Sequence, residues 1–296
     1  MPDSTSFPLP SPPFQGVGLG LRWEFIEEIA ARLDDPEIQA RIPFFEVPPE
    51  NYLRRGGFYF DALVRVHERF PLLTHGLTLS VGATDAFDID YFADLRMFLQ
   101  RVKTPFHSDH LCFSGHNGRM FHELLPLPLN RAAATHTAQR LVEAQDRLGL
   151  PLLMENITHY FIPGRAAMLE TDFIGEILEA ANAWLLLDVN NIYVNSLNYG
   201  FDAFQFLQKM PLARTKAIHV AGHEWRADDE AWIDTHGADV EDPVLALLEW
   251  TIAQTGPLPV ILERDHHIPP LETLLVEMNR IDAAYQRGLR GFHERR

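Results

Sequence analysis

Apolar and polar positions along this chain alternate between two patterns. Eight short apolar runs, typical of buried strands, begin at intervals of about 28–44 residues, at 16–22, 44–49, 72–82, 106–114, 150–158, 184–194, 215–223 and 258–265. Between them, apolar residues recur every three or four positions. This spacing predicts amphipathic helices over residues 60–70, 91–102, 131–148, 172–182, 201–210, 242–255 and 269–286.

Strands that alternate with helices indicate parallel βαβ units. Eight such units within 296 residues predict an α/β fold, a (β/α)8 TIM barrel, whose functional residues lie at the C-terminal rim of the strands. The alternative is a doubly wound open sheet. The first run, GVGLG at 16–20, favours the barrel because it lacks the third glycine of a dinucleotide-binding fingerprint.

The two ends of the chain differ from its middle. Five prolines among residues 2–13 predict a Pro-rich disordered tail over 1–14, followed by one TIM-barrel domain over 15–287 and a frayed basic tail over 288–296. No apolar run approaches the ~18 residues that span a bilayer. The first residues also lack the basic and apolar regions of a secretory signal, so we expect a cytoplasmic protein without a membrane partner.

Most of the predicted strands begin apolar and end polar. The polar residues at these ends are Glu46, Glu50, Asn51, His75, His107, Asp109, His110, Glu155, Asn156, Asp188, Asn190, Asn191, His219, His223, Glu263 and Asp265. In a parallel barrel these ends converge on one rim. Any one of them alone is typical of a helix cap or a loop hydrogen bond. Together they favour bound cations, because clustered carboxylates and imidazoles are costly to desolvate without neutralisation.

The donor atoms restrict the metal. They are nitrogen and oxygen, which suits iron, manganese or zinc rather than copper(I) or a cluster. Strand pleating turns His107 and Asp109 to one side and His110 to the other, so only one pair faces the axis. In the segment WIDTHG, Asp234 and His236 share a face if extended and could bind one metal. About eight candidate ligands exceed the three or four that one metal needs, so we expect two or three metals.

Charge and cysteine content narrow the function further. The formal net charge is 25 − 41 = −16, which disfavours binding to the phosphate backbone of nucleic acids. The single cysteine, Cys112, excludes an intrachain disulfide framework and a cysteine-ligated zinc or iron–sulfur site. We expect Cys112 itself to be a small buried apolar residue.

From about Gly16 to Tyr285, the chain resembles the DUF692 (UPF0276) family, which includes the methanobactin-biosynthesis oxidase. The segments that carry the resemblance are FFEVPPENYLRRGG (44–57), THGLTLSVG (74–82), HSDHLCFSG (107–115), LLPLPLNRAA (124–133), LMENITHYF (153–161), LLLDVNNIYVNSLNYG (186–200), IHVAGH (218–223), IDTHG (233–237) and LERDHHIPP (262–270). One departure is Arg264, because the family commonly has E-W-D where this chain has Glu263-Arg264-Asp265.

The resemblance implies a TIM barrel that holds two or three irons in a mixed-valent Fe(II)/Fe(III) state and uses dioxygen. It implies oxidation of cysteine residues in a ribosomally made precursor peptide, commonly presented by a small partner protein. The metal ligands that it implies are His75, His110, Glu155, Asp188, Asn191, His219, Asp234, His236 and Glu263. Among these, we expect Glu155, Asp188 and His219 to be catalytic, with Glu155 and Asp188 as bridging carboxylates.

Other rim residues are expected to orient the ligands rather than to bind metal. They are Glu46, Glu50, Asn51, Asp109, Asn156, Asn190 and His223. Two other functions stay open. One is a zinc-, manganese- or magnesium-dependent isomerase or hydrolase acting on a small molecule. The other is a non-catalytic metal-binding or interaction module, which the clustering of ionisable groups at one rim disfavours.

Overall fold

The computed structural model describes residues 14–295, and its centre is a closed barrel of eight parallel strands. In barrel order the strands are β1 (Gly16–Gly20), β2 (Phe45–Val47), β3 (Leu72–His75), β4 (His107–His110), β7 (Leu152–Glu155), β8 (Trp184–Asp188), β9 (Thr215–Val220) and β12 (Pro259–Leu262), which returns to β1. Each strand lies within one of the eight predicted runs. The predicted TIM barrel is therefore confirmed.

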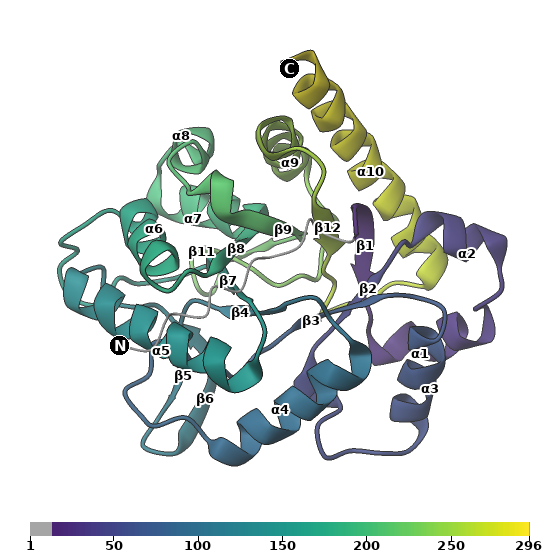
Figure 1. The fold of residues 1–296 in the computed structure, drawn as a ribbon. Helices are drawn as coiled ribbons and strands as arrows, with labels where there is room; N and C mark the ends of the chain where they lie inside the picture. Colours follow the sequence, from purple (N-terminus) through teal and green to yellow (C-terminus); the bar gives the residue numbers. More distant parts are fainter. Residues whose placement is uncertain (1–13, 296) are drawn as a thin grey trace.

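Helices surround the barrel (Figure 1). They are α1 (Trp23–Ala31), α2 (Pro36–Arg41), α3 (Phe58–His67), α4 (Ile89–Val102), α5 (Arg131–Leu148), α6 (Glu170–Ala180), α7 (Val189–Tyr199), α8 (Ala203–Leu207), α9 (Asp242–Thr255) and α10 (Leu271–Glu294), with short 3-10 turns at Pro49–Asn51 and Leu212–Arg214. Two antiparallel hairpins lie outside the barrel: β5 (Phe113–His116) with β6 (Arg119–Leu125), and β10 (Glu224–Arg226) with β11 (Ala231–Ile233). No helix in the described part of the chain is long and apolar enough to cross a membrane.

Two predicted boundaries need correction, and a third cannot be compared. The run 184–194 is a strand only to Asp188, whose carboxylate accepts the Asn191 amide hydrogen bond at 2.6 Å and starts α7. The tail expected over 288–296 is helical to residue 294, because Gly288 lets α10 pack closely on α9. The tail over 1–14 lies outside the described residues except Phe14, whose ring lies 5.8 Å from that of Phe44.

A dry apolar layer fills the N-terminal part of the barrel. Its buried residues are Phe44, Leu73, Phe106, Leu153, Leu186, Ala217 and Ile261, one from each strand or from the residue before it. The eighth strand contributes Gly18, where an added Cβ would lie 2.3 Å from the Phe44 ring. The large ring thus occupies the space that a side chain at position 18 would need. This layer closes the barrel beneath the rim.

Candidate metal centre

A layer of polar side chains lies directly above the apolar one. Because side chains in a strand alternate between faces, the residue two positions after each core residue also points inward. The residues at these positions are Glu46, His75, Ser108, Glu155, Asp188, His219 and Glu263, and all are buried. We call them the ligand layer. Side chains two positions apart on a strand lie on the same face, so polar residues that are far apart in the sequence form one compact cluster here.

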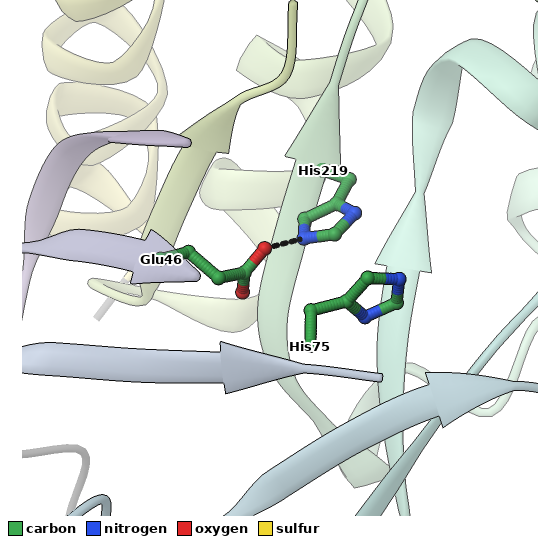
Figure 2. A group of neighbouring side chains, drawn as sticks. All are labelled: Glu46, His75 and His219. Carbon is green, nitrogen blue, oxygen red and sulfur yellow. Dashed lines mark hydrogen bonds and ion pairs between the residues drawn. The ribbon is translucent and has the colours of Figure 1, made fainter. Parts of the chain in front are cut away.

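His219 lies at the centre of this layer, between carboxylates. Its Nε2 is 2.9 Å from Glu46 Oε2 and its Nδ1 is 2.8 Å from Glu263 Oε2. Figure 2 shows Glu46 from β2 and His75 from β3 directed toward His219 on β9. Burial alone lowers the pKa of His219, but the Glu263, Glu46 and Glu155 carboxylates outweigh it and raise that pKa well above its ordinary value.

A second group joins two histidines to Glu155. His75 Nε2 lies 3.2 Å from His110 Nε2 and 3.2 Å from Glu155 Oε2. Burial lowers the pKa of His110, but the Glu155 carboxylate and Asp109 raise it to about 9. His107 lies on the opposite face of β4 with Nδ1 3.1 Å from Thr74 Oγ1, and burial lowers its pKa to about 4. The structure thus brings His110, and not His107, to the ligand layer.

Asp188 is fully buried, and only one of its two carboxylate oxygens accepts a hydrogen bond from the described residues. One oxygen caps α7, whereas Oδ2 has no hydrogen-bond partner among the described residues. Burial and then the Glu155 carboxylate raise its pKa well above the ordinary value. Asn191, a predicted ligand, accepts a hydrogen bond from Thr158 Oγ1 at 2.6 Å and donates to the Asn156 carbonyl at 3.0 Å. Its side-chain oxygen is therefore engaged by the protein.

Asp234 and His236 reach the rim from the loop after β11. His236 Nε2 lies 2.9 Å from Asp234 Oδ1, and His236 Nδ1 lies 2.8 Å from Asp265 Oδ2. Arg22 Nε donates to the other Asp265 oxygen at 2.6 Å. With the hydrogen on Nδ1 bonded to Asp265, loss of the proton from Nε2 would let that nitrogen bind a cation. Arg22 was not among the predicted site residues, although a basic residue two positions after β1 could have indicated it.

The residues expected to orient the ligands occupy several places. Asn190 Nδ2 donates to Asp234 Oδ1 at 2.7 Å, and its oxygen lies 2.8 Å from His223 Nδ1. Asn156 bonds the backbone of Asp188 in both directions, and Asp109 accepts the amide hydrogen bonds of Leu79 and His110. Glu50 accepts from Leu77, Thr78 and Tyr91, and Glu46 lies in the ligand layer itself.

Four groups of side chains in the described part of the chain could hold a cation. They are Glu46, His75 and His219; His75, His110 and Glu155; Glu155, Asp188, His219 and Glu263; and, as the outer group, His236, Glu263 and Asp265. Two buried oxygens here, Glu46 Oε1 and Asp188 Oδ2, have no hydrogen-bond partner among the described residues. Glu155 Oε2, His219 Nδ1 and His236 Nε2 make ion-pair contacts that are not aligned as hydrogen bonds. Buried lone pairs without partners are costly, and a cation would satisfy them, so the donor set fits metal binding.

The site opens into a cavity of about 230 Å³. Its lining includes Arg22, Glu46, Asn51, His75, Leu77, His110, His236, Glu263 and Asp265. The cavity thus reaches the ligand layer and the outer group from one side. It offers a substrate direct access to the side chains that could hold metals.

Comparison with known proteins gives a consistent result. The model of the family described as the RiPP precursor modification enzyme MbnB/TglH/ChrH matches residues 16–286. The UPF0276 protein of Acinetobacter baylyi is 41% identical over 275 residues, 93% of each chain. A UPF0276 protein of Caulobacter vibrioides is 39% identical over 279 residues, 94% of this chain and 97% of that one.

Similarity to solved structures supports the barrel fold but no particular activity. A D-allulose 3-epimerase from Methylomonas sp. aligns with a TM-score of 0.58 at 14% identity, covering 98% of this chain and 100% of the epimerase. Endonuclease IV from Thermus thermophilus aligns with a TM-score of 0.50 at 14% identity, covering 95% of this chain and 100% of that one. Identities this low do not carry the epimerase or nuclease activity over to this chain.

Proposed function

The chain belongs to the MbnB/TglH/ChrH family of RiPP precursor modification enzymes, and we propose that it is a multinuclear iron oxygenase that oxidises cysteine residues of a precursor peptide. One observation carries the proposal: the metal-capable groups share their members. His75, Glu155, His219 and Glu263 each belong to two groups. Shared carboxylates are able to bridge neighbouring cations, so the arrangement favours one centre of two or three ions over separate mononuclear sites.

The residues divide into two sets toward such a centre. His75, His110, Glu155, Asp188, His219 and Glu263 would hold the inner ions. His236 and Glu263 of the outer group, together with Asp234 beside His236 Nε2, would hold an outer ion, while Asp265 contacts His236 Nδ1. All donors are imidazole nitrogen or carboxylate oxygen, which suits iron. When bound, mixed-valent iron supplies affinity for a thiolate and electrons for dioxygen.

The protein's own part is to bind, orient and hold protons. Asp265 fixes the His236 ring by its contact with Nδ1. The Ser108 hydroxyl of β4 lies 3.0 Å from His75 Nδ1 and fixes the His75 ring in the same way. The apolar layer beneath the ligands excludes water from the barrel interior. The only cysteine of the chain, Cys112, is buried, so the cysteine that is oxidised arrives on the substrate. A small partner protein is expected to present that peptide.

Anaerobic purification with iron tests the proposal. Metal counting is expected to give two or three irons per chain, with a coupled mixed-valent signal in Mössbauer or EPR spectra. Glu155→Gln should lower the count, whereas Glu249→Gln, at a half-exposed ion pair with Arg287, should not. A chain that holds only zinc or magnesium and consumes no dioxygen with a cysteine-containing peptide would instead support the isomerase or hydrolase alternative.

A further inference from the structure

The loop that carries His236 has an unfavourable backbone conformation. His236 has φ of +50°, in the left-handed region that costs a residue with a side chain about 1–3 kcal/mol. Two backbone hydrogen bonds hold it there: its amide donates to the Gly222 carbonyl, and its carbonyl accepts from the Asp265 amide, both at 3.0 Å. Such a conformation persists only where surrounding contacts fix it.

Arg264 makes the remaining contacts to this loop. Its guanidinium donates to the Gly237 carbonyl at 2.9 Å, to Asp239 at 2.7 Å and to Glu277 on α10 at 2.5 Å. The other Glu277 oxygen accepts the Val240 amide hydrogen bond at 2.7 Å. The side chains of Arg264 and Glu277 are both 4% exposed, so this pair is an ionic contact inside the protein.

Stability alone does not account for a buried pair of this kind. Desolvation of two charges costs several kcal/mol per ion, and well-packed apolar residues of similar volume are often as stable or more so. The pair instead fixes the positions of the segments that it connects. It ties the end of β12, the loop and α10 together immediately after His236, on the side of the chain opposite the ligand Glu263.

We infer that Arg264 is a positioning residue for the outer group, acting with Glu277 to hold the loop so that His236 and Asp234 reach the metal. This inference rests on the proposed function, because it requires that a metal binds there. Lysine would be a poor replacement. The fork of an arginine serves three acceptors in different directions, whereas an ammonium is a single point of charge.

The test is metal counting after anaerobic iron(II) loading, with Arg264→Met alone and Arg264→Met combined with Glu277→Leu. Both variants are expected to bind one iron fewer per chain and to keep the inner ions. The double variant leaves no unpaired buried charge, so it decides the question if the single variant does not fold. A folded double variant with the full wild-type count overturns the inference.

Amide hydrogen exchange and a matched control variant separate positioning from general stability. In the metal-free double variant, the His236 amide, whose acceptor is the Gly222 carbonyl and is left in place, should exchange hydrogen at least tenfold faster than in the wild type, and unchanged exchange would contradict the inference. Arg280→Met is the matched control, because Arg280, which lies on α10 like Glu277, forms a surface ion pair with Asp242 at the start of α9. It should change neither readout. If wild-type protein binds no iron, the proposed function fails, whereas full binding by the double variant refutes only the role of Arg264.

Discussion

Asp188→Asn should stabilise the metal-free protein while it weakens metal binding. Asp188 is fully buried, and its Oδ2 has no hydrogen-bond partner among the described residues although Glu155 lies close enough to raise its pKa. The substitution keeps the oxygen that accepts the Asn191 amide hydrogen bond and caps α7. It replaces an ionisable group by a neutral one in a layer crowded with carboxylates. The metal-free variant therefore lacks the destabilising carboxylate oxygen and keeps the oxygen that caps α7.

The size of the expected stability gain follows from Asp188 Oδ2, which has no hydrogen-bond partner among the described residues. A buried charged atom without a partner costs about 1–3 kcal/mol or more. In proteins of 150–250 residues, 1 kcal/mol shifts the melting temperature by about 2–4 °C. The expected gain in the melting temperature of chelator-treated protein at pH 8 is therefore roughly 2–12 °C. Added zinc should raise the melting temperature of the wild type and raise that of Asp188→Asn much less.

The stability gain of Asp188→Asn should increase with pH. Burial and the Glu155 carboxylate raise the pKa of Asp188 in the folded protein well above its unfolded value of about 3.9. Wild-type stability therefore falls as pH rises from the unfolded pKa to the folded one, and the loss persists above it. The asparagine variant lacks this loss, so its advantage should be small near pH 4 and grow with pH.

Thermal unfolding of chelator-treated proteins at several pH values measures this effect. The matched control is Asp202→Asn, because Asp202 caps α8 through the Gln205 amide in an exposed position. That variant should show little change at any pH. If Asp188→Asn were no more stable than the wild type at pH 8, or if its advantage were the same at pH 4, the burial of an unpaired charge would not be the cause.

Three other predictions concern the metal ligands. His110→Ala should lower the bound metal by at least one ion, whereas His107→Phe should keep the full count because that ring lies on the other face of β4; equal losses would refute the assignment. Gly222→Ala should displace the His236 loop and remove the outer metal, since an added Cβ would lie 2.0 Å from the Ala238 carbonyl oxygen; normal metal content would contradict this. Zinc binding at pH 7.5 should release more than one proton per chain, because raised histidine pKa values place protons where metals bind; calorimetry in two buffers with different ionisation enthalpies checks this.

The eight strands and most of the ligand layer could be predicted because both depend on local periodicity. Each strand is a short apolar run, and the side chain two positions past a core residue must point the same way. Leu153 and Glu155 on β7, and Leu186 and Asp188 on β8, follow this rule. The burial of carboxylates at these positions then makes a cation the simplest partner.

The parts that could not be predicted depend on contacts between distant segments. Asp265 lies two residues beyond Glu263, the predicted ligand that follows β12, and the bond from Arg22, 243 positions earlier, helps to hold it beside His236. The left-handed backbone of His236 likewise has no local signal. It is set by Gly222, by the Asp265 amide and by the loop held through Arg264.

Two strands lack a ligand at the level of the ligand layer, and the reason is steric. On β4 that position is Ser108, and on β1 it is Gly20, which pairs with Glu46 in the register of the barrel. Both are small, and in each case the residue two positions later reaches back into the layer. His110 comes within 3.2 Å of His75, and a Cβ at position 20 would lie 2.7 Å from the Arg22 guanidinium. Small residues at these positions thus make room for a long side chain from above. Because Arg22 then holds Asp265 against His236, Gly20 acts on the outer group through the space that it leaves open.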